Sequence, residues 1–247
     1  MDDRLIREDE TLDDLFRGRL RILQKRHGYR FSMEPILLAH FASPLRGGRV
    51  IDLGTGSGVI PLILALRGEA REIVGLEVQE ELAEMASRSV RINGLEERVT
   101  ILRGDYQDLS GIFPPQSFDH AVSNPPYHPS GSGRVSPTSS RALARHELSG
   151  TIEALVAAAR YLLKTKGRLW LTYPPARLVS LLGCLQRHGF EPKRLRMVHG
   201  RKTLPARMAL LESVLGGREG LEILPPLILY REGNAYTEEL ERIYAMG

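Results

Sequence analysis

The chain has 247 residues, of which 42% are apolar, and a net charge of +4, so it can bury one enzyme-sized core without cross-links. Its single cysteine, Cys184, excludes an intrachain disulfide, and no histidine or cysteine pattern has metal-ligand spacing, so we expect no metal. The first residues lack the basic segment followed by an apolar segment that marks a secretion signal, and the apolar runs are too short to span a bilayer. We therefore expect a cytoplasmic protein without a membrane span.

The first predicted element is a basic extension over residues 1–33, which precedes a core over residues 34–247. Residues 15–33 contain six arginines and lysines and no acid. A helix is predicted to begin at Pro35. Because we find no internal repeat and no linker, we treat 1–247 as one domain, and we expect a monomer.

A glycine-rich turn follows the first strand of the core. The apolar strand Val50–Leu53 leads into Gly54-Thr55-Gly56-Ser57-Gly58, and an apolar helix is predicted over Val59–Leu66. Glycines let a ligand approach the backbone, and the helix amino terminus offers N–H groups to it. A dinucleotide fingerprint would place Gly or Ala where Val59 stands. With Asp52 before the turn, the spacing instead resembles the first motif of S-adenosylmethionine-dependent methyltransferases.

Two acids follow the next two predicted strands, where a bound nucleoside would lie. The strand Glu72–Val78 carries Glu77 about twenty residues after the glycine turn, where a carboxylate can bind both ribose hydroxyls. After a helix predicted over Glu80–Ile92, the strand Val99–Leu102 leads to Asp105, which could accept the adenine amino group. A solvated acid at a strand end or in a loop is the alternative for each.

The motif Asn124-Pro125-Pro126-Tyr127 follows a strand predicted over Phe118–Ser123 and points to a reaction. An exocyclic amine or an amide is a weak nucleophile, because its lone pair is delocalised. The carbonyl oxygens of Asn124 and Pro125 can accept its two N–H bonds and concentrate electron density on the nitrogen. The prolines fix the carbonyl directions, and Tyr127 offers a flat face to a base. We predict a pocket for an amine that is methylated, with a proline-rich turn as the alternative.

The remaining elements complete a sheet. A Pro-, Ser- and Gly-rich loop over 128–140 is predicted to be a mobile lid. Then follow a helix over Ile152–Leu163, a strand over Gly167–Tyr173 and a helix from Pro174 to about His188. Three alternating stretches near 194–199, 207–214 and 221–230 predict further strands and a closing hairpin. These elements predict an α/β fold with a Rossmann-like, mostly parallel sheet of seven strands and a C-terminal antiparallel hairpin.

Basic side chains gather in three segments that bracket the amine pocket, which suggests a polyanionic substrate. For any single arginine, a solvated surface position is the alternative. We predict RNA contacts from Lys25, Arg26, Arg134, Arg141, Arg145, Lys193, Arg194, Arg201 and Lys202.

Taken together, these residues resemble the bacterial tRNA (adenine-N6)-methyltransferases that modify the adenosine beside the anticodon of a valine tRNA. The resemblance covers nearly the whole chain and includes residues 24–32, 52–58, 75–79, 93–95, 124–127 and His146-Glu147, to which we assign no role. It implies a class I methyltransferase fold, S-adenosylmethionine as cofactor and a tRNA substrate. It implies a catalytic set of Asn124, Pro125, Pro126 and Tyr127. It also implies cofactor contacts from Arg30, Phe31, Ser32, Asp52, Gly54, Thr55, Gly56, Gly58, Glu77, Val78, Asp105, Tyr106 and Asn124.

Several other functions stay open at this point. Enzymes that methylate a release-factor glutamine at N5 share the Asn-Pro-Pro-Tyr motif, but they usually carry a separate helical domain before the catalytic core. Guanine-N2 methylation of rRNA and adenine methylation of DNA are further alternatives, although DNA enzymes tend to carry a sizeable target-recognition region. A non-enzymatic RNA-binding protein on an inactive methyltransferase scaffold would show a broken glycine turn or a substituted Asn124, and both are intact. A nicotinamide oxidoreductase would bind no S-adenosylmethionine.

Overall fold

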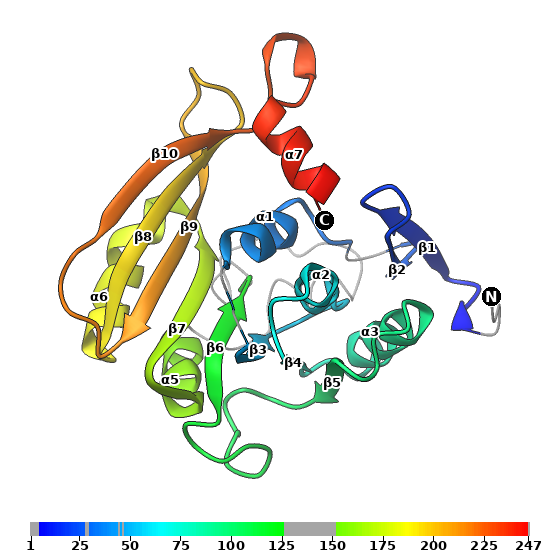
Figure 1. Cartoon of the computed structure of the whole chain (residues 1–247), viewed down its shortest axis with the longest axis horizontal. Helices are drawn as coiled ribbons and strands as arrows, with labels where there is room; N and C mark the ends of the chain where they lie inside the picture. The colour runs from blue at the N-terminus through cyan, green and yellow to red at the C-terminus, as the bar shows by residue number, and fades with distance from the viewer. Residues whose placement is uncertain (1–4, 28–29, 44, 46, 126–151, 247) are drawn as a thin grey trace.

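A computed structural model describes residues 5–27, 30–43, 45, 47–125 and 152–246 of the chain (Figure 1). Its centre is an eight-stranded sheet with the order β10-β8-β9-β7-β6-β3-β4-β5. The strands are β3 (Arg49–Leu53), β4 (Glu72–Glu77), β5 (Val99–Arg103), β6 (Phe118–Ser123), β7 (Leu163–Tyr173), β8 (Phe190–His199), β9 (Ala206–Leu215) and β10 (Glu222–Ile228).

The sheet is parallel from β7 to β5, and β9 lies antiparallel between β7 and β8. The predicted α/β class and the closing antiparallel strands are therefore confirmed. The central sheet of the described residues has eight strands where seven were predicted. Strand β10, which corresponds to the stretch predicted near 221–230, pairs in parallel with β8 and covers its outer edge, which would otherwise present unpaired backbone groups.

Helices cover both faces of the sheet. They are α1 (Glu34–Phe41), α2 (Val59–Arg67), α3 (Glu80–Ile92), α5 (Ile152–Leu162), α6 (Leu178–Arg187) and α7 (Glu238–Met246), with short 3₁₀ turns at Pro175–Arg177 and Glu232–Asn234. Side chains alternate along each strand, so Val50 and Trp170 pack toward α1 and α2, while Ile51 and Leu169 pack toward α5 and α6. In the described part of the chain, no helix is long and apolar enough to cross a membrane.

The basic extension contains a β-hairpin that docks on α3. Strands β1 (Glu10–Leu15) and β2 (Leu20–Lys25) pair antiparallel as a separate two-stranded sheet. Backbone N–H groups of β2 bond to α3 side chains, from Leu23 to Ser89 Oγ at 3.0 Å and from Arg21 to Asn93 Oδ1 at 2.9 Å. The hairpin is thus held at defined positions against the core.

A buried ion pair joins the hairpin to α3. The Glu10 carboxylate has no exposed surface, and it accepts hydrogen bonds from Arg88 Nη1 at 2.6 Å and Nη2 at 2.7 Å. Burial opposes the negative charge, yet the hydrogen bonds from Arg88 hold the pKa of Glu10 below its ordinary value. Glu84, which is partly exposed, binds the other side of the same guanidinium.

Candidate active site

The glycine turn lies at the carboxyl end of β3, between β4 and β6 in the sheet. Gly54, Gly56 and Gly58 all adopt positive φ, which side chains rarely tolerate. The N–H groups of Gly54 and Thr55 bond to the Leu76 carbonyl at 2.9 and 3.0 Å, so the turn is tied to β4. A β-carbon added at Gly54 would meet no atom of the described residues within 4 Å, so there is open space beside the turn. The glycine turn has the conformation and place expected from the sequence, and its contact with a ligand stays a prediction.

Asp52 is the buried acid beneath this turn. Its Oδ2 accepts a hydrogen bond from Thr55 Oγ1 at 2.6 Å, whereas its Oδ1 has no partner among the described residues. Burial raises the pKa of Asp52 to about 7, against the hydrogen bond from Thr55 that favours the charged form, and the charge of Glu77 raises it further. An unpaired oxygen on a buried carboxyl is a group that a ligand donor could satisfy.

The raised pKa predicts how stability depends on pH. The pKa of Asp52 is raised from 3.8 to about 7, so in that window the unfolded chain releases a proton that the folded protein retains. Stability then falls as pH rises, by about 1.4 kcal/mol per pH unit. We expect the unfolding free energy of Asp52→Asn, relative to that of the wild type, to rise by about 2–3 kcal/mol between pH 5 and pH 8. Urea unfolding at both pH values tests this, with Asp108→Asn as the exposed control; an equal difference at both pH values would contradict it.

Glu77 ends β4 next to the turn and is 5% exposed. Its Oε2 accepts the Gly56 N–H at 2.8 Å, and its Oε1 accepts the Gln79 N–H at 3.0 Å. Burial raises its pKa above the ordinary value, and these backbone donors oppose the rise. Each carboxylate oxygen can accept more than one hydrogen bond, so the predicted contact to ribose hydroxyls is compatible with these bonds.

Three further predicted contacts surround Glu77. Asp105 follows β5, and its Oδ1 accepts the Gln107 N–H at 2.8 Å. Tyr106 lies close enough that Asp105 and Glu77 add to the effect of burial, which raises the pKa of its hydroxyl to about 12 and keeps it neutral. Val78 is an apolar side chain that is 50% exposed and could cover a flat ring. The edge formed by β3, β4 and β5 thus brings together the residues predicted to hold a nucleoside.

Asn124 follows β6, one strand away from the glycine turn. Its Oδ1 accepts a hydrogen bond from the Thr172 hydroxyl, and Thr172 is fully buried near the end of β7. Ser123, the preceding residue, donates its hydroxyl to the Leu53 carbonyl at 2.6 Å and ties β6 to the strand that leads into the turn. Pro125 is buried beside Asn124. Thr172 was not predicted; the signal for it was a hydroxyl within the apolar strand Leu169–Tyr173.

Arg30, Phe31 and Ser32 lie between the hairpin and α1. The Phe31 N–H bonds to Gln24 Oε1 at 3.0 Å, Arg30 pairs with Asp13, and Ser32 Oγ accepts the Glu34 N–H at 3.3 Å. The docked hairpin therefore sets the path of this segment, and its contact with a cofactor stays a prediction.

The residues predicted to contact RNA occupy different places. Arg201 and Lys202 follow β8 at the same edge of the sheet as Asn124, whereas Lys193 and Arg194 lie near the start of β8. Lys25 is nearly buried and pairs with Asp9 at 2.7 Å and with Glu81. Arg26 is exposed and bonds to the Glu8 carbonyl. Pro126, Tyr127, Arg134, Arg141, Arg145, His146, Glu147 and the predicted lid lie outside the described residues.

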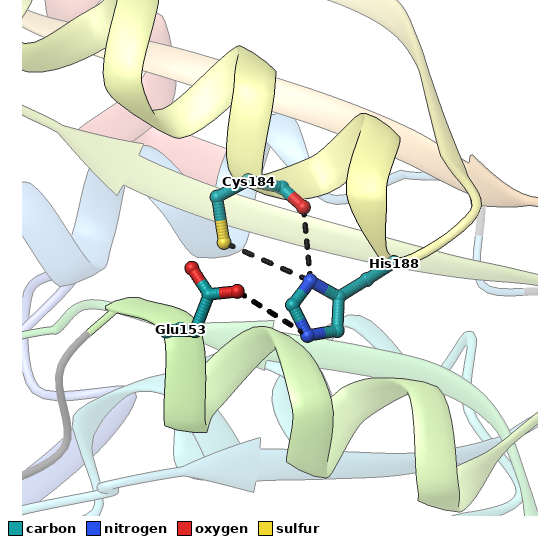
Figure 2. Close-up of side chains that lie close together, drawn as sticks. All are labelled: Glu153, Cys184 and His188. Atoms are coloured by element: carbon teal, nitrogen blue, oxygen red, sulfur yellow. Dashed lines mark hydrogen bonds and ion pairs between the residues drawn. The ribbon is translucent and has the colours of Figure 1, made fainter.

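The structure also brings Glu153 of α5 next to Cys184 and His188, which lie four residues apart at the end of α6 (Figure 2). His188 Nε2 lies 3.7 Å from Glu153 Oε1, and His188 Nδ1 lies 3.0 Å from the Cys184 carbonyl, to which it must donate. Burial raises the pKa of the Cys184 thiol to about 12, so the thiol stays protonated. Arg187 already pairs with Glu153 at 2.9 Å. We interpret this cluster as a contact between α5 and α6, and the expectation of no metal remains a prediction.

Comparison with known proteins identifies the family to which this chain is similar. The family described as Methyltransferase small domain matches residues 34–176. A tRNA1(Val) (adenine(37)-N6)-methyltransferase from Porphyromonas gingivalis is 34% identical over 158 residues, which cover 62% of this chain and only 61% of that relative. A protein of the same name from Tolumonas auensis is 29% identical over 221 residues, which cover 87% of this chain and 88% of the relative. These matches confirm the resemblance drawn from the sequence.

Solved structures share the fold. A crystal structure of a protein described as a predicted O-methyltransferase, from Agrobacterium tumefaciens, has a TM-score of 0.70 at 23% identity and covers 86% of this chain and 95% of that one. A tRNA m1G37 methyltransferase from M. jannaschii has a TM-score of 0.59 at 12% identity, over 85% of this chain and 55% of that one. At these identities the likeness establishes the class I methyltransferase fold and nothing finer.

Proposed function

Because this chain belongs to the methyltransferase small domain family, we propose that it is an S-adenosylmethionine-dependent methyltransferase acting on the N6 amine of an adenosine in tRNA, next to the anticodon of a valine tRNA. The observation that carries the proposal is the placement of Asn124. Its carbonyl oxygen, held by Thr172, lies one strand from a glycine turn with open space above it. An amine acceptor and a nucleoside site therefore share one edge of the sheet.

The residues at this edge fit S-adenosylmethionine. Glu77 offers carboxylate oxygens for the ribose, Asp105 could accept the adenine amino group, and exposed Val78 could cover the ring. Asp52 has an unpaired buried oxygen beneath the turn. When bound, this cofactor supplies an activated methyl group on a sulfonium.

The chain itself contributes mainly orientation to the reaction. Asn124 Oδ1 and the Pro125 carbonyl accept the two N–H bonds of the target amine, which localises the nitrogen lone pair for in-line attack. Thr172 fixes the direction of the Asn124 oxygen and uses only part of its accepting capacity. The amine proton leaves to water after transfer, so neither a protein base nor a covalent intermediate is required.

The remaining expectations are part of the same proposal. We infer a single domain over 1–247, with an extension over 1–33 and a core over 34–247, which works as a cytoplasmic monomer with tRNA as its partner and without a metal. The predicted RNA contacts and the roles of Arg30, Phe31 and Ser32 belong to this proposal as well.

Methyl transfer from labelled S-adenosylmethionine tests the proposed reaction. Unmodified tRNA and a release factor are offered separately, and the labelled products are digested and identified. N6-methyladenosine from tRNA is the expected product. Methylglutamine from the release factor would support the proposed amine pocket but show that the substrate is a protein amide and not a tRNA adenosine. Failure to label either substrate, together with failure to bind the cofactor, would favour a binding protein on an inactive scaffold.

Thr172→Val should lower kcat about tenfold, because valine has a similar shape but cannot donate the hydrogen bond that aligns Asn124. The affinity for S-adenosylmethionine should change by less than about twofold. Thr172→Ser restores a hydroxyl at the same position and should recover most of kcat. Equal losses of kcat in the valine and serine variants would show that Thr172 acts only through side-chain packing and not through its hydroxyl group.

A further inference from the structure

A second cavity lies away from the glycine turn, on the face of the sheet that carries Trp170 and toward the end where β7 begins. Its volume is about 540 Å³. It is lined by Ser43, Lys166, Arg168, Trp170, Lys193, Arg194, Glu212, Val214, Gly217 and Arg218. Strands β7, β8 and β9 and the connection from β9 to β10 all contribute residues to it.

The cavity is strongly positive. Five cationic side chains and one carboxylate line it, so its local net charge equals the +4 of the whole chain. The carboxylate, Glu212, is buried and pairs with both Arg168 and Arg194. Lys166 and Lys193 donate to the backbone carbonyls of Gly216 and Arg218, which bind these ammonium groups without neutralising them. The positive charge at this place is therefore largely uncompensated.

A buried donor lies at the same cavity. Trp170 is 1% exposed, and its indole Nε1 has no acceptor among the described residues. A buried donor of this kind is normally satisfied by protein, water or ligand. A smaller hollow of about 370 Å³ shares Lys166 and is lined by His120, whose ring centroid lies 5.2 Å from that of Trp170. The His120 Nδ1 is likewise buried and without a partner in the described part of the chain.

We propose that this cavity binds a phosphate group. Arginine and lysine side chains that converge on one space match the several acceptor oxygens and the multiple negative charge of a phosphate better than they match a single carboxylate. The indole N–H adds a neutral donor of the kind an oxyanion can accept. Such a group can come from a free nucleotide or from the backbone of an RNA, and only the second source depends on the proposed function.

Trp170 is the only tryptophan of the chain, so its fluorescence reports on this cavity directly. Inorganic pyrophosphate, titrated at constant ionic strength, should change the emission in a saturable way, and calorimetry should give the same dissociation constant. Arg218→Gln removes an exposed cation of the lining and should raise that constant by at least about fivefold. Arg91→Gln, an exposed cation on α3, removes the same charge elsewhere and should change it by less than about twofold.

Two outcomes would overturn the proposal. One is the absence of both saturable emission change and binding heat. The other is an equal loss in the Arg218 and Arg91 variants, which would mean that only the overall charge attracts the anion. Steady-state methylation of tRNA distinguishes the two sources of the phosphate. If the cavity binds an RNA phosphate, Arg218→Gln should raise the KM for tRNA and leave kcat unchanged. If it binds a free nucleotide, that KM should not change. Pyrophosphate binding stands as a test even if no substrate is methylated.

Discussion

Asn124→Ala should lower kcat about 10²–10³-fold while the protein stays folded. The substitution removes an acceptor that we propose to bind the target amine, and a single such group in an active site contributes a few kcal/mol of transition-state stabilisation. Alanine cannot replace the carbonyl oxygen that Thr172 holds at the end of β6. The measurement is single-turnover methylation of tRNA at saturating S-adenosylmethionine, with cofactor affinity determined separately.

The matched control for this variant is Asn234→Ala, which removes the same side chain at an exposed position in the turn Glu232–Asn234. It should keep kcat within about twofold. Cofactor affinity should be reduced much less than kcat in Asn124→Ala, because most of the predicted cofactor contacts lie at the carboxyl ends of β3, β4 and β5. Normal turnover in Asn124→Ala would show that the amine pocket lies elsewhere.

Glu10→Ala should destabilise the docked hairpin by about 3–5 kcal/mol, because it leaves the Arg88 guanidinium nearly buried without its main partner. The loss should be largest in the hairpin, since β1 and β2 form a sheet of their own that contacts the core mainly through α3 and to a smaller extent through α2. Hydrogen exchange of the β1 and β2 amides measures it. Because the hairpin also holds Phe31 through Gln24, the affinity for S-adenosylmethionine should fall if the segment 30–32 contacts the cofactor.

Glu84→Ala provides a control on the same arginine. Glu84 also pairs with Arg88, but its side chain is 40% exposed, so its removal should cost no more than about 1 kcal/mol. Equal effects of the two substitutions would contradict the view that burial makes Glu10 the stronger partner. Faster exchange in Glu10→Ala with unchanged cofactor affinity would separate the hairpin from cofactor binding.

Charge counting in the sequence did not distinguish structural cations from available ones. Lys25 belongs to an acid-free stretch, and that pattern predicted RNA contact. In the folded protein its ammonium is buried among Asp9, Glu10 and Glu81, which lie in an earlier acidic segment and on α3. Such pairings depend on which elements dock, and a one-dimensional pattern does not contain them.

The sequence by itself determined the class of the fold, and it predicted the edge of the sheet at which we propose that the chemistry takes place. Strand periodicity, the glycine turn and the Asn-Pro motif are local signals, because backbone conformation and hydrogen-bonding chemistry are set within a few residues. The register of β6 beside β7, which brings Thr172 to Asn124, was decided by the tertiary structure. So were the burial of Glu10 against Arg88 and the convergence of Lys166, Lys193 and Arg218 on one cavity. These contacts join residues distant in sequence, and their energies come from burial and proximity that exist only after the sheet and helices have packed.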